Sequence, residues 1–196
     1  MKFRFLNIFL ILSVTVSGQL IPVIETYENG NIKNINYHRK RASGIDKVKL
    51  EEYFENGFKK EQGPFKNGQK NGKWFYWYEN GEKRSEGVYK NGVKDGFWIG
   101  WYENGQKQGE VTWKEGKEQG LWIIWYPNGQ KNKEYIWKNG KKNGMSIEWW
   151  NNGQKQLEGM WKNNKKDGKW KYWYENGDLI KYEIHEMGNL INEKWY

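Results

Sequence analysis

The sequence contains no cysteine, so neither a disulfide framework nor a thiolate metal site can form. The same absence excludes a lipid-anchored bacterial lipoprotein, which needs a cysteine at its processed N-terminus. Apolar residues are scarce at 36%, too few for a thick two-layer core of Leu, Ile and Val. Aromatic residues, in contrast, reach 18%, with 14 Trp and 13 Tyr. Disordered chains lack aromatics, so this composition favours a thin folded structure with large side chains at its few buried positions.

Residues suited to catalysis are also few. Beyond residue 18 the sequence has three serines, Ser43, Ser85 and Ser146, and none lies in a Gly-x-Ser-x-Gly elbow that would activate it as a nucleophile. His38 and His185 are the two histidines, and both fall in irregular ends of the sequence pattern. The sequence has no calcium-binding loop and no phosphate-binding glycine motif. We therefore expect no catalytic, metal-binding or cofactor-binding residues, no cofactor, and no enzymatic activity.

One short phrase organises the chain: two aromatic residues, a variable residue and an Asn-Gly pair, as in Trp77-Tyr78-Glu79-Asn80-Gly81. Such a phrase is typical of a β-hairpin tip, and recurrence at a fixed period indicates a repeat architecture. We therefore predict an all-β fold, an elongated single-layer antiparallel sheet of 24-residue β-hairpin repeats. The turn-forming glycines of six copies are Gly57, Gly81, Gly105, Gly129, Gly153 and Gly177.

A second turn follows each tip, as in Lys66-Asn67-Gly68, with another glycine four residues later, Gly72. We predict a tight two-residue loop at each Asn-Gly tip and a longer, glycine-containing loop at each second turn. Pro127, which precedes the fourth Asn-Gly pair of the regular series, conflicts with a two-residue loop because proline lacks the N–H that closes it.

The two-residue loop sets the predicted register. It places Trp77 opposite Arg84 and Trp74 opposite Gly87, with Tyr78 opposite Lys83. Alternation then divides the aromatics between two faces of the sheet, one with Trp74 and the other with Trp77. The sequence does not decide which face is buried. As the candidate binding face we take the ladder Trp77, Trp101, Trp125, Trp149 and Trp173.

The formal net charge is +9, from 33 basic and 24 acidic residues. Much of the basic charge is lysine in turns, where it favours solubility and protects sheet edges. One acidic residue recurs at the same place in four units, at Glu86, Glu110, Glu134 and Glu158. Two carboxylates in one cleft could cleave glycosides, but this periodicity instead indicates a ladder of charges paired with nearby lysines.

The N-terminal residues 1–18 read as a secretory signal peptide: Lys2 and Arg4 precede a short apolar run, and Ser17-Gly18 provides small residues for cleavage. The alternative is an uncleaved anchor. We predict export to the periplasm or medium, then an N-terminal cap with one degenerate repeat (19–50), a repeat array (51–177) and a C-terminal cap (178–196).

The unit from Gly72 to Gly96 reads Gly-x-Trp-x-x-Trp-Tyr-Glu-Asn-Gly, then Glu-Gly-x-Tyr-Lys-Asn-Gly-x-x-Asp-Gly. This pattern resembles the bacterial variant of the MORN (membrane occupation and recognition nexus) repeat over about 50–188. The resemblance implies a sheet of β-hairpins and a role in scaffolding, membrane-proximal contact or protein binding. Some relatives are labelled antitoxins, which implies neutralising a partner toxin, but an export signal fits a cytoplasmic antitoxin poorly. The family supplies no catalytic residues.

Three functions remain open on the sequence. The first is a non-enzymatic scaffold that binds a protein or envelope partner through an aromatic face. The second is a carbohydrate or cell-wall module, since exposed Trp and Tyr stack on sugar rings. The third is a basic surface for membranes or nucleic acid, of which export argues against nucleic acid. We expect a protein or cell-envelope polymer as partner, and the sequence leaves open peripheral membrane contact, a toxin-neutralising role and a homodimer.

Overall fold

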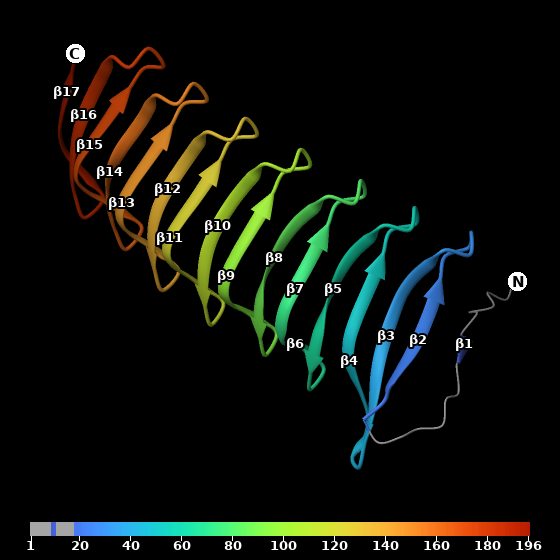
Figure 1. The fold of residues 1–196 in the computed structure, drawn as a ribbon. Helices are drawn as coiled ribbons and strands as arrows, with labels where there is room; N and C mark the ends of the chain where they lie inside the picture. Colours follow the sequence, from blue (N-terminus) through green and yellow to red (C-terminus); the bar gives the residue numbers. More distant parts are fainter. Residues whose placement is uncertain (1–8, 11–17) are drawn as a thin grey trace, which may run out of the picture. The chain divides into compact units, whose positions relative to one another are not determined.

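The computed structural model describes residues 9–10 and 18–196, so the predicted signal peptide lies almost entirely outside the described residues (Figure 1). The chain divides into two compact units, Met1–Val93 and Lys94–Tyr196. All secondary structure in the described ranges is β-strand, which confirms the all-β prediction. Those ranges therefore contain no helix able to cross a membrane.

In the first unit consecutive strands pair antiparallel in chain order, and β5 bonds both the short β6 and β7. Its strands are β1 (Phe9–Leu10), β2 (Leu20–Thr26), β3 (Ile32–Arg41), β4 (Gly44–Tyr53), β5 (Lys59–Lys66), β6 (Gln69–Lys70), β7 (Gly72–Trp77) and β8 (Lys83–Lys90).

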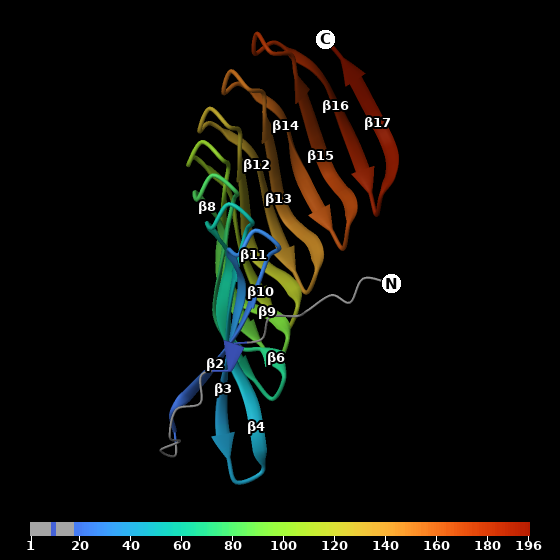
Figure 2. The ribbon, with the colours of Figure 1, turned by 90° about the vertical axis from the view of Figure 1, so that its right-hand side faces the viewer.

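The second unit repeats the same arrangement, each strand antiparallel to the next. Within each unit the strands form one open layer, as Figures 1 and 2 show. The strands of the second unit are β9 (Val93–Trp101), β10 (Lys107–Lys114), β11 (Lys117–Trp125), β12 (Lys131–Lys138), β13 (Lys141–Trp149), β14 (Lys155–Lys162), β15 (Lys165–Trp173), β16 (Leu179–Glu186) and β17 (Asn189–Trp195).

The Asn-Gly tips are three-residue loops, which corrects the predicted two-residue loop. At the tip between β7 and β8 the Gly81 N–H donates to the Tyr78 carbonyl, and the Tyr78 N–H donates to the Glu82 carbonyl. Gly81 has a φ of 87°, so the loop is a type I turn followed by a left-handed glycine. The Asn80 side chain completes it by accepting from the Glu82 N–H at 2.9 Å.

The three-residue loop changes the register beside the tip and explains the proline. Trp77 pairs with Lys83 rather than with Arg84, and the extra residue Arg84 restores the predicted pairing of Trp74 with Gly87. Pro127 occupies the second position of its type I turn, where a fixed negative φ is favoured and no N–H is needed.

The tight two-residue loops are instead the second turns, which corrects the longer loop predicted there. Lys138 pairs with Lys141 across Asn139-Gly140, whose φ values of 52° and 76° define a type I′ turn. The glycine four residues further, Gly144 in this repeat, lies inside the next strand, where it has a φ of 136°. The pairing is irregular at this level of the repeat, with a register shift between Tyr135 and Trp137.

Hydrogen bonds between successive tips join neighbouring repeats. The Tyr102 hydroxyl donates to the Trp125 carbonyl and the Tyr126 hydroxyl to the Trp149 carbonyl, both at 2.8 Å. The Asn152 amide likewise donates to the Glu175 carbonyl at 2.7 Å. The aromatic and Asn residues of the tip phrase therefore hold each repeat to the next.

This ladder predicts that Tyr126→Phe lowers the free energy of unfolding by about 1 kcal/mol, because a part-buried carbonyl loses its donor. Tyr174→Phe is the matched control, since the Tyr174 hydroxyl has no partner among the described residues and the side chain is 55% exposed. Urea unfolding followed by tryptophan fluorescence measures both. Equal losses in the two variants would show that the tip ladder contributes no stability.

One face of each sheet, the core face, carries the buried side chains. Trp74 is 0% exposed in the first unit, and Trp98 and Trp170 are 6% and 1% exposed in the second. The rings lie on backbone glycine: a Cβ added to Gly159 would lie 2.2 Å from the Trp170 ring. In the first unit Trp74 pairs with Gly87, but its ring covers Gly63 on the other neighbouring strand. Flat rings over glycine give a thin core without a second layer.

Candidate interaction surface

The predicted tryptophan ladder lies on the opposite side, which we call the open face of each unit. Trp77 lies in the first unit, and Trp101, Trp125, Trp149 and Trp173 lie in the second; all are half-buried. Lysine ammonium groups lie over these rings: Lys107 Nζ lies 5.4 Å from the Trp125 ring centroid, and Lys131 Nζ lies 5.6 Å from that of Trp149. The indoles therefore lie partly beneath ammonium groups and are not fully open to solvent.

The recurring glutamates hold those lysines, as the predicted charge ladder requires. In the second unit Glu134 accepts from Lys131 at 2.8 Å, and Glu158 accepts from Lys155 at 2.8 Å and Lys171 at 3.1 Å. Burial alone would raise the pKa of Glu158, but the bonds from the two lysines outweigh it and lower the pKa below its ordinary value. These carboxylates are ion-paired.

The open face of the second unit also carries an exposed apolar feature that the sequence pattern did not predict. Five side chains of the second unit form a row that we call the apolar stripe, in which Leu121 pairs with Ile136 and Met145 with Met160. Its members, with their exposed fractions, are Phe97 (52%), Leu121 (47%), Ile136 (39%), Met145 (45%) and Met160 (43%). Strand alternation was the available signal, because Phe97 and Leu121 directly precede core positions and must point the other way.

The six turn-forming glycines all have positive φ, from 80° at Gly105 to 92° at Gly177. They lie at the tips, so they shape the hairpins and do not contact the apolar stripe. His38 lies on β3, where its Nδ1 is 3.1 Å from the Asn36 carbonyl. His185 lies on the core face, where its Nε2 is 2.8 Å from Glu183. No group of three or more metal-ligating side chains occurs in the ranges that the structure describes.

Lysines also cover aromatic rings on the core face. Lys142 Nζ lies 3.7 Å from the Tyr135 ring centroid, and Lys94 Nζ lies 4.2 Å from that of Trp98. Burial lowers the pKa of both lysines. Also on the core face, near the C-terminal end of the second unit, four groups bond to Glu183 in a part-buried network. They are Lys166 (3.0 Å), Tyr172 (2.6 Å), Lys181 (2.7 Å) and His185 (2.8 Å).

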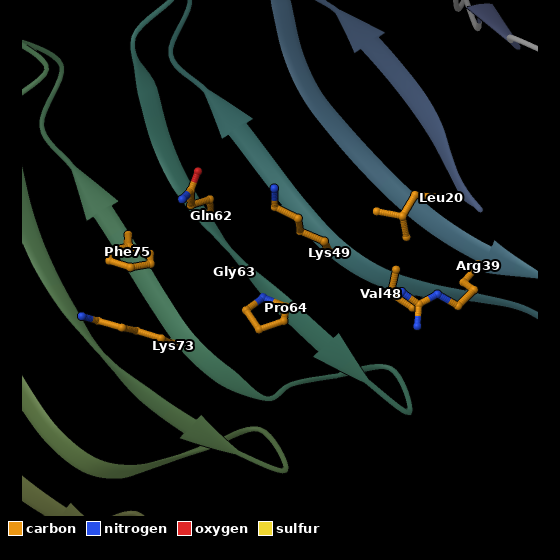
Figure 3. Close-up of a pocket in the computed structure, with 9 residues that line it drawn as sticks. All are labelled: Leu20, Arg39, Val48, Lys49, Gln62, Gly63, Pro64, Lys73 and Phe75. Carbon is orange, nitrogen blue, oxygen red and sulfur yellow. The ribbon is translucent and has the colours of Figure 1, made fainter. Parts of the chain in front are cut away.

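The surface of each unit carries a hollow among the described residues. In the second unit Trp149, Trp173, Lys155 and Gln154 line a shallow depression of about 510 Å³ beside the tips. In the first unit a hollow of about 340 Å³ lies over β4, β5 and β7, with Val48, Pro64 and Phe75 among its apolar lining (Figure 3). Its cationic residues are Arg39, Lys49 and Lys73. Lys49 and Lys73 are already ion-paired, with Glu51 at 2.6 Å and Glu86 at 2.7 Å.

Hairpins that recur every 24 residues, with one core face and one open face, define an all-β repeat protein. The family model of the MORN repeat variant matches four segments, 70–91, 94–115, 118–139 and 166–185. The chain therefore carries repeats of the MORN variant. The unmatched stretch between the third and fourth segments carries Ser146 where neighbouring repeats have Trp, and Asn164 where they have Gly.

A crystal structure of a protein with unknown function from Bacteroides fragilis is similar at 13% identity, over 91% of this chain and 92% of that chain, with a TM-score of 0.18. No protein of curated function matches the sequence.

Proposed function

We propose that the protein is a non-enzymatic scaffold that binds a protein partner through the open face of its second unit. The observation that carries the proposal is the apolar stripe, in which five large side chains 39–52% exposed lie together on three consecutive hairpins. Leu121, Ile136, Met145 and Met160 lie on four successive strands, and Thr112 on β10 separates them from Phe97. An exposed apolar row of this kind is typical of an interaction site rather than of free surface. Methionine, present twice in the stripe, adapts its shape to irregular partners.

The surroundings of the stripe support a protein partner. Along one side run the paired residues Lys107–Glu110, Lys131–Glu134 and Lys155–Glu158, which form a polar border already satisfied within the sheet. An apolar centre with a satisfied polar rim is the usual arrangement of a protein–protein interface. Successive hairpins repeat this arrangement, so the contact extends along the array.

Affinity capture with the full chain as bait tests the proposal. Leu121→Ser with Met145→Ser removes two members of the stripe without touching the core face. Leu190→Ser with Ile191→Ser is the matched control, because these β17 side chains are 51% and 60% exposed but lie outside the stripe. We expect one protein captured by the wild type to be retained by the control and lost, by about tenfold or more, from the stripe variant. Equal capture by both variants would refute the proposal.

A second candidate is a carbohydrate site, favoured by the depression between Trp149 and Trp173. Lys155 and Gln154 supply hydrogen-bond donors beside the two indoles. If this site binds sugars, peptidoglycan fragments quench tryptophan emission in the wild type and not in Trp149→Ala. Absence of quenching in the wild type would exclude it.

A further inference from the structure

The second turns of the second unit place lysines directly opposite each other. At three successive type I′ turns the two flanking residues are both lysine and are register partners, Lys114 with Lys117, Lys138 with Lys141, and Lys162 with Lys165. We call these six residues the lysine pairs. Like charges directly opposite each other destabilise a sheet. Single lysines would provide the same solubility, so solubility alone does not explain why the lysines are paired.

The lysine pairs are free to contact a partner. All six side chains are exposed, and none takes part in an ion pair or a cation–π contact within the described ranges. The contrast with the opposite end of the hairpins is clear, because Lys107, Lys131 and Lys155 are all bonded to glutamates there. The first turn contains one carboxylate, Glu115, and the other two turns contain none.

The stems of two of these lysines rest on the next turn. A Cβ added to Gly140 would lie 3.6 Å from the Lys117 Cβ, and one added to Gly188 would lie 3.3 Å from the Lys165 Cβ. The charges are therefore held in a row along one edge of the unit, one pair per hairpin. Adjacent pairs are two strands apart, a separation of about 10 Å.

Alternation places this row beside the apolar stripe on the open face. Lys138 lies two residues beyond Ile136, and Lys162 two residues beyond Met160, so each lysine points to the same side as its stripe neighbour. The open face thus carries, in order, an unpaired basic row, the apolar stripe, and the ion-paired lysine–glutamate border.

We propose that this part of the open face binds a protein segment that carries an acidic row beside an apolar row. The inference rests on the proposed function and specifies its partner. The six lysines lack counter-charges, so an acidic row on the partner would complement them. An apolar row on the partner would cover the apolar stripe. A polysaccharide or polyphosphate has no apolar row to cover the stripe. A bilayer surface presents uniform negative charge, which does not match a face whose far border contains carboxylates.

The spacing suggests the probe. In an α-helix residues seven apart are about 10.5 Å apart along the axis, which is close to the separation of adjacent lysine pairs. A fluorescein-labelled helical peptide with Glu at seven-residue spacing and Leu in an adjacent row therefore tests the surface. Its controls are a peptide of the same composition with the rows scrambled, a peptide with Leu replaced by Ser, and phosphatidylglycerol vesicles.

Fluorescence anisotropy with the full chain should show saturable binding of the acidic amphipathic peptide that weakens as salt is added. Lys138→Gln with Lys141→Gln should weaken binding about tenfold and reduce its salt dependence. Lys40→Gln with Lys66→Gln removes the same charge from exposed lysines of the first unit and should leave binding unchanged. Lys138→Gln with Lys141→Gln relieves a like-charge pair, so the unfolding temperature of this variant should not fall. An unchanged unfolding temperature separates lost binding from lost folding.

The other outcomes separate the two proposals. If Leu121→Ser with Met145→Ser abolishes peptide binding while the lysine variant binds like the wild type, the scaffold proposal stands and the acidic partner is refuted. If the peptide does not bind, if the scrambled or serine peptide binds equally, or if the vesicles bind instead, the inference is overturned. If neither variant changes binding, both proposals are refuted.

Discussion

Gly159→Ala is expected to lower the free energy of unfolding by about 3 kcal/mol, because the added methyl group overlaps a buried ring. A Cβ at this position would lie 2.2 Å from the Trp170 ring, which is 1% exposed and cannot move into solvent without opening the core. The ring is further fixed by the bond from its Nε1 to the Met160 carbonyl at 3.1 Å. The edge of Trp161 packs on it at a centroid distance of 4.9 Å.

Gly109→Ala is the matched control for this prediction. Gly109 lies in the equivalent type of strand, does not have a positive φ, and its added Cβ would meet nothing closer than the Ile123 carbonyl at 3.5 Å. Chemical unfolding monitored by near-ultraviolet circular dichroism reports the packing of the indoles directly. A Gly159→Ala variant as stable as Gly109→Ala would show that the ring does not lie on the backbone.

Glu183→Gln is expected to cost about 3 kcal/mol at neutral pH, because it leaves the charges of a part-buried network without their common partner. Burial of the Glu183 carboxylate acts to raise its pKa, but bonds from His185, Lys181, Tyr172 and Lys166 outweigh burial and hold the pKa well below its ordinary value. Glu193→Gln is the control: that carboxylate is 40% exposed and lies 3.4 Å from Lys181, so its loss should have little effect.

The lowered pKa also predicts the pH dependence of the Glu183 effect. A carboxylate with a depressed folded-state pKa stabilises the protein above its unfolded-state pKa, and this stabilisation is lost as pH falls through the folded-state value. The difference in stability between wild type and Glu183→Gln should therefore be largest near neutral pH and shrink below the ordinary carboxyl pKa of 4.5. Urea midpoints measured across acid pH check this, and a difference independent of pH would exclude a linked titration.

The open face carries one feature that the sequence predicts, the tryptophan ladder, and one that it does not, the apolar stripe. The tryptophan ladder predicted as the binding face lies on the open face, where lysine ammonium groups lie 5.4–5.8 Å from the ring centroids of Trp125, Trp149 and Trp173. The apolar stripe, which carries the proposed function, is not among the residues that the sequence predicts as a site. Its residues differ from repeat to repeat, as in Phe97, Leu121 and Met145, so a search for identical repeated residues passes over them.

The turns show the limits of local pattern most clearly. Asn-Gly occurs at both kinds of turn, and the dipeptide itself is compatible with a type I′ loop and with a type I turn followed by a left-handed glycine. The structure assigns the first form to Asn139-Gly140 and the second to Asn80-Gly81. Pro127 was the one residue in the sequence that already argued for the longer loop.

The sequence by itself determined the β-hairpin architecture, the 24-residue period and the division of aromatics between two faces, because strand alternation and turn chemistry are local properties. Tertiary structure alone decided which face is buried, since that depends on Trp74 and Trp170 reaching the glycines of neighbouring strands. It also decided which lysines are neutralised and which are left free, because that depends on the carboxylates that the sheet register brings within reach.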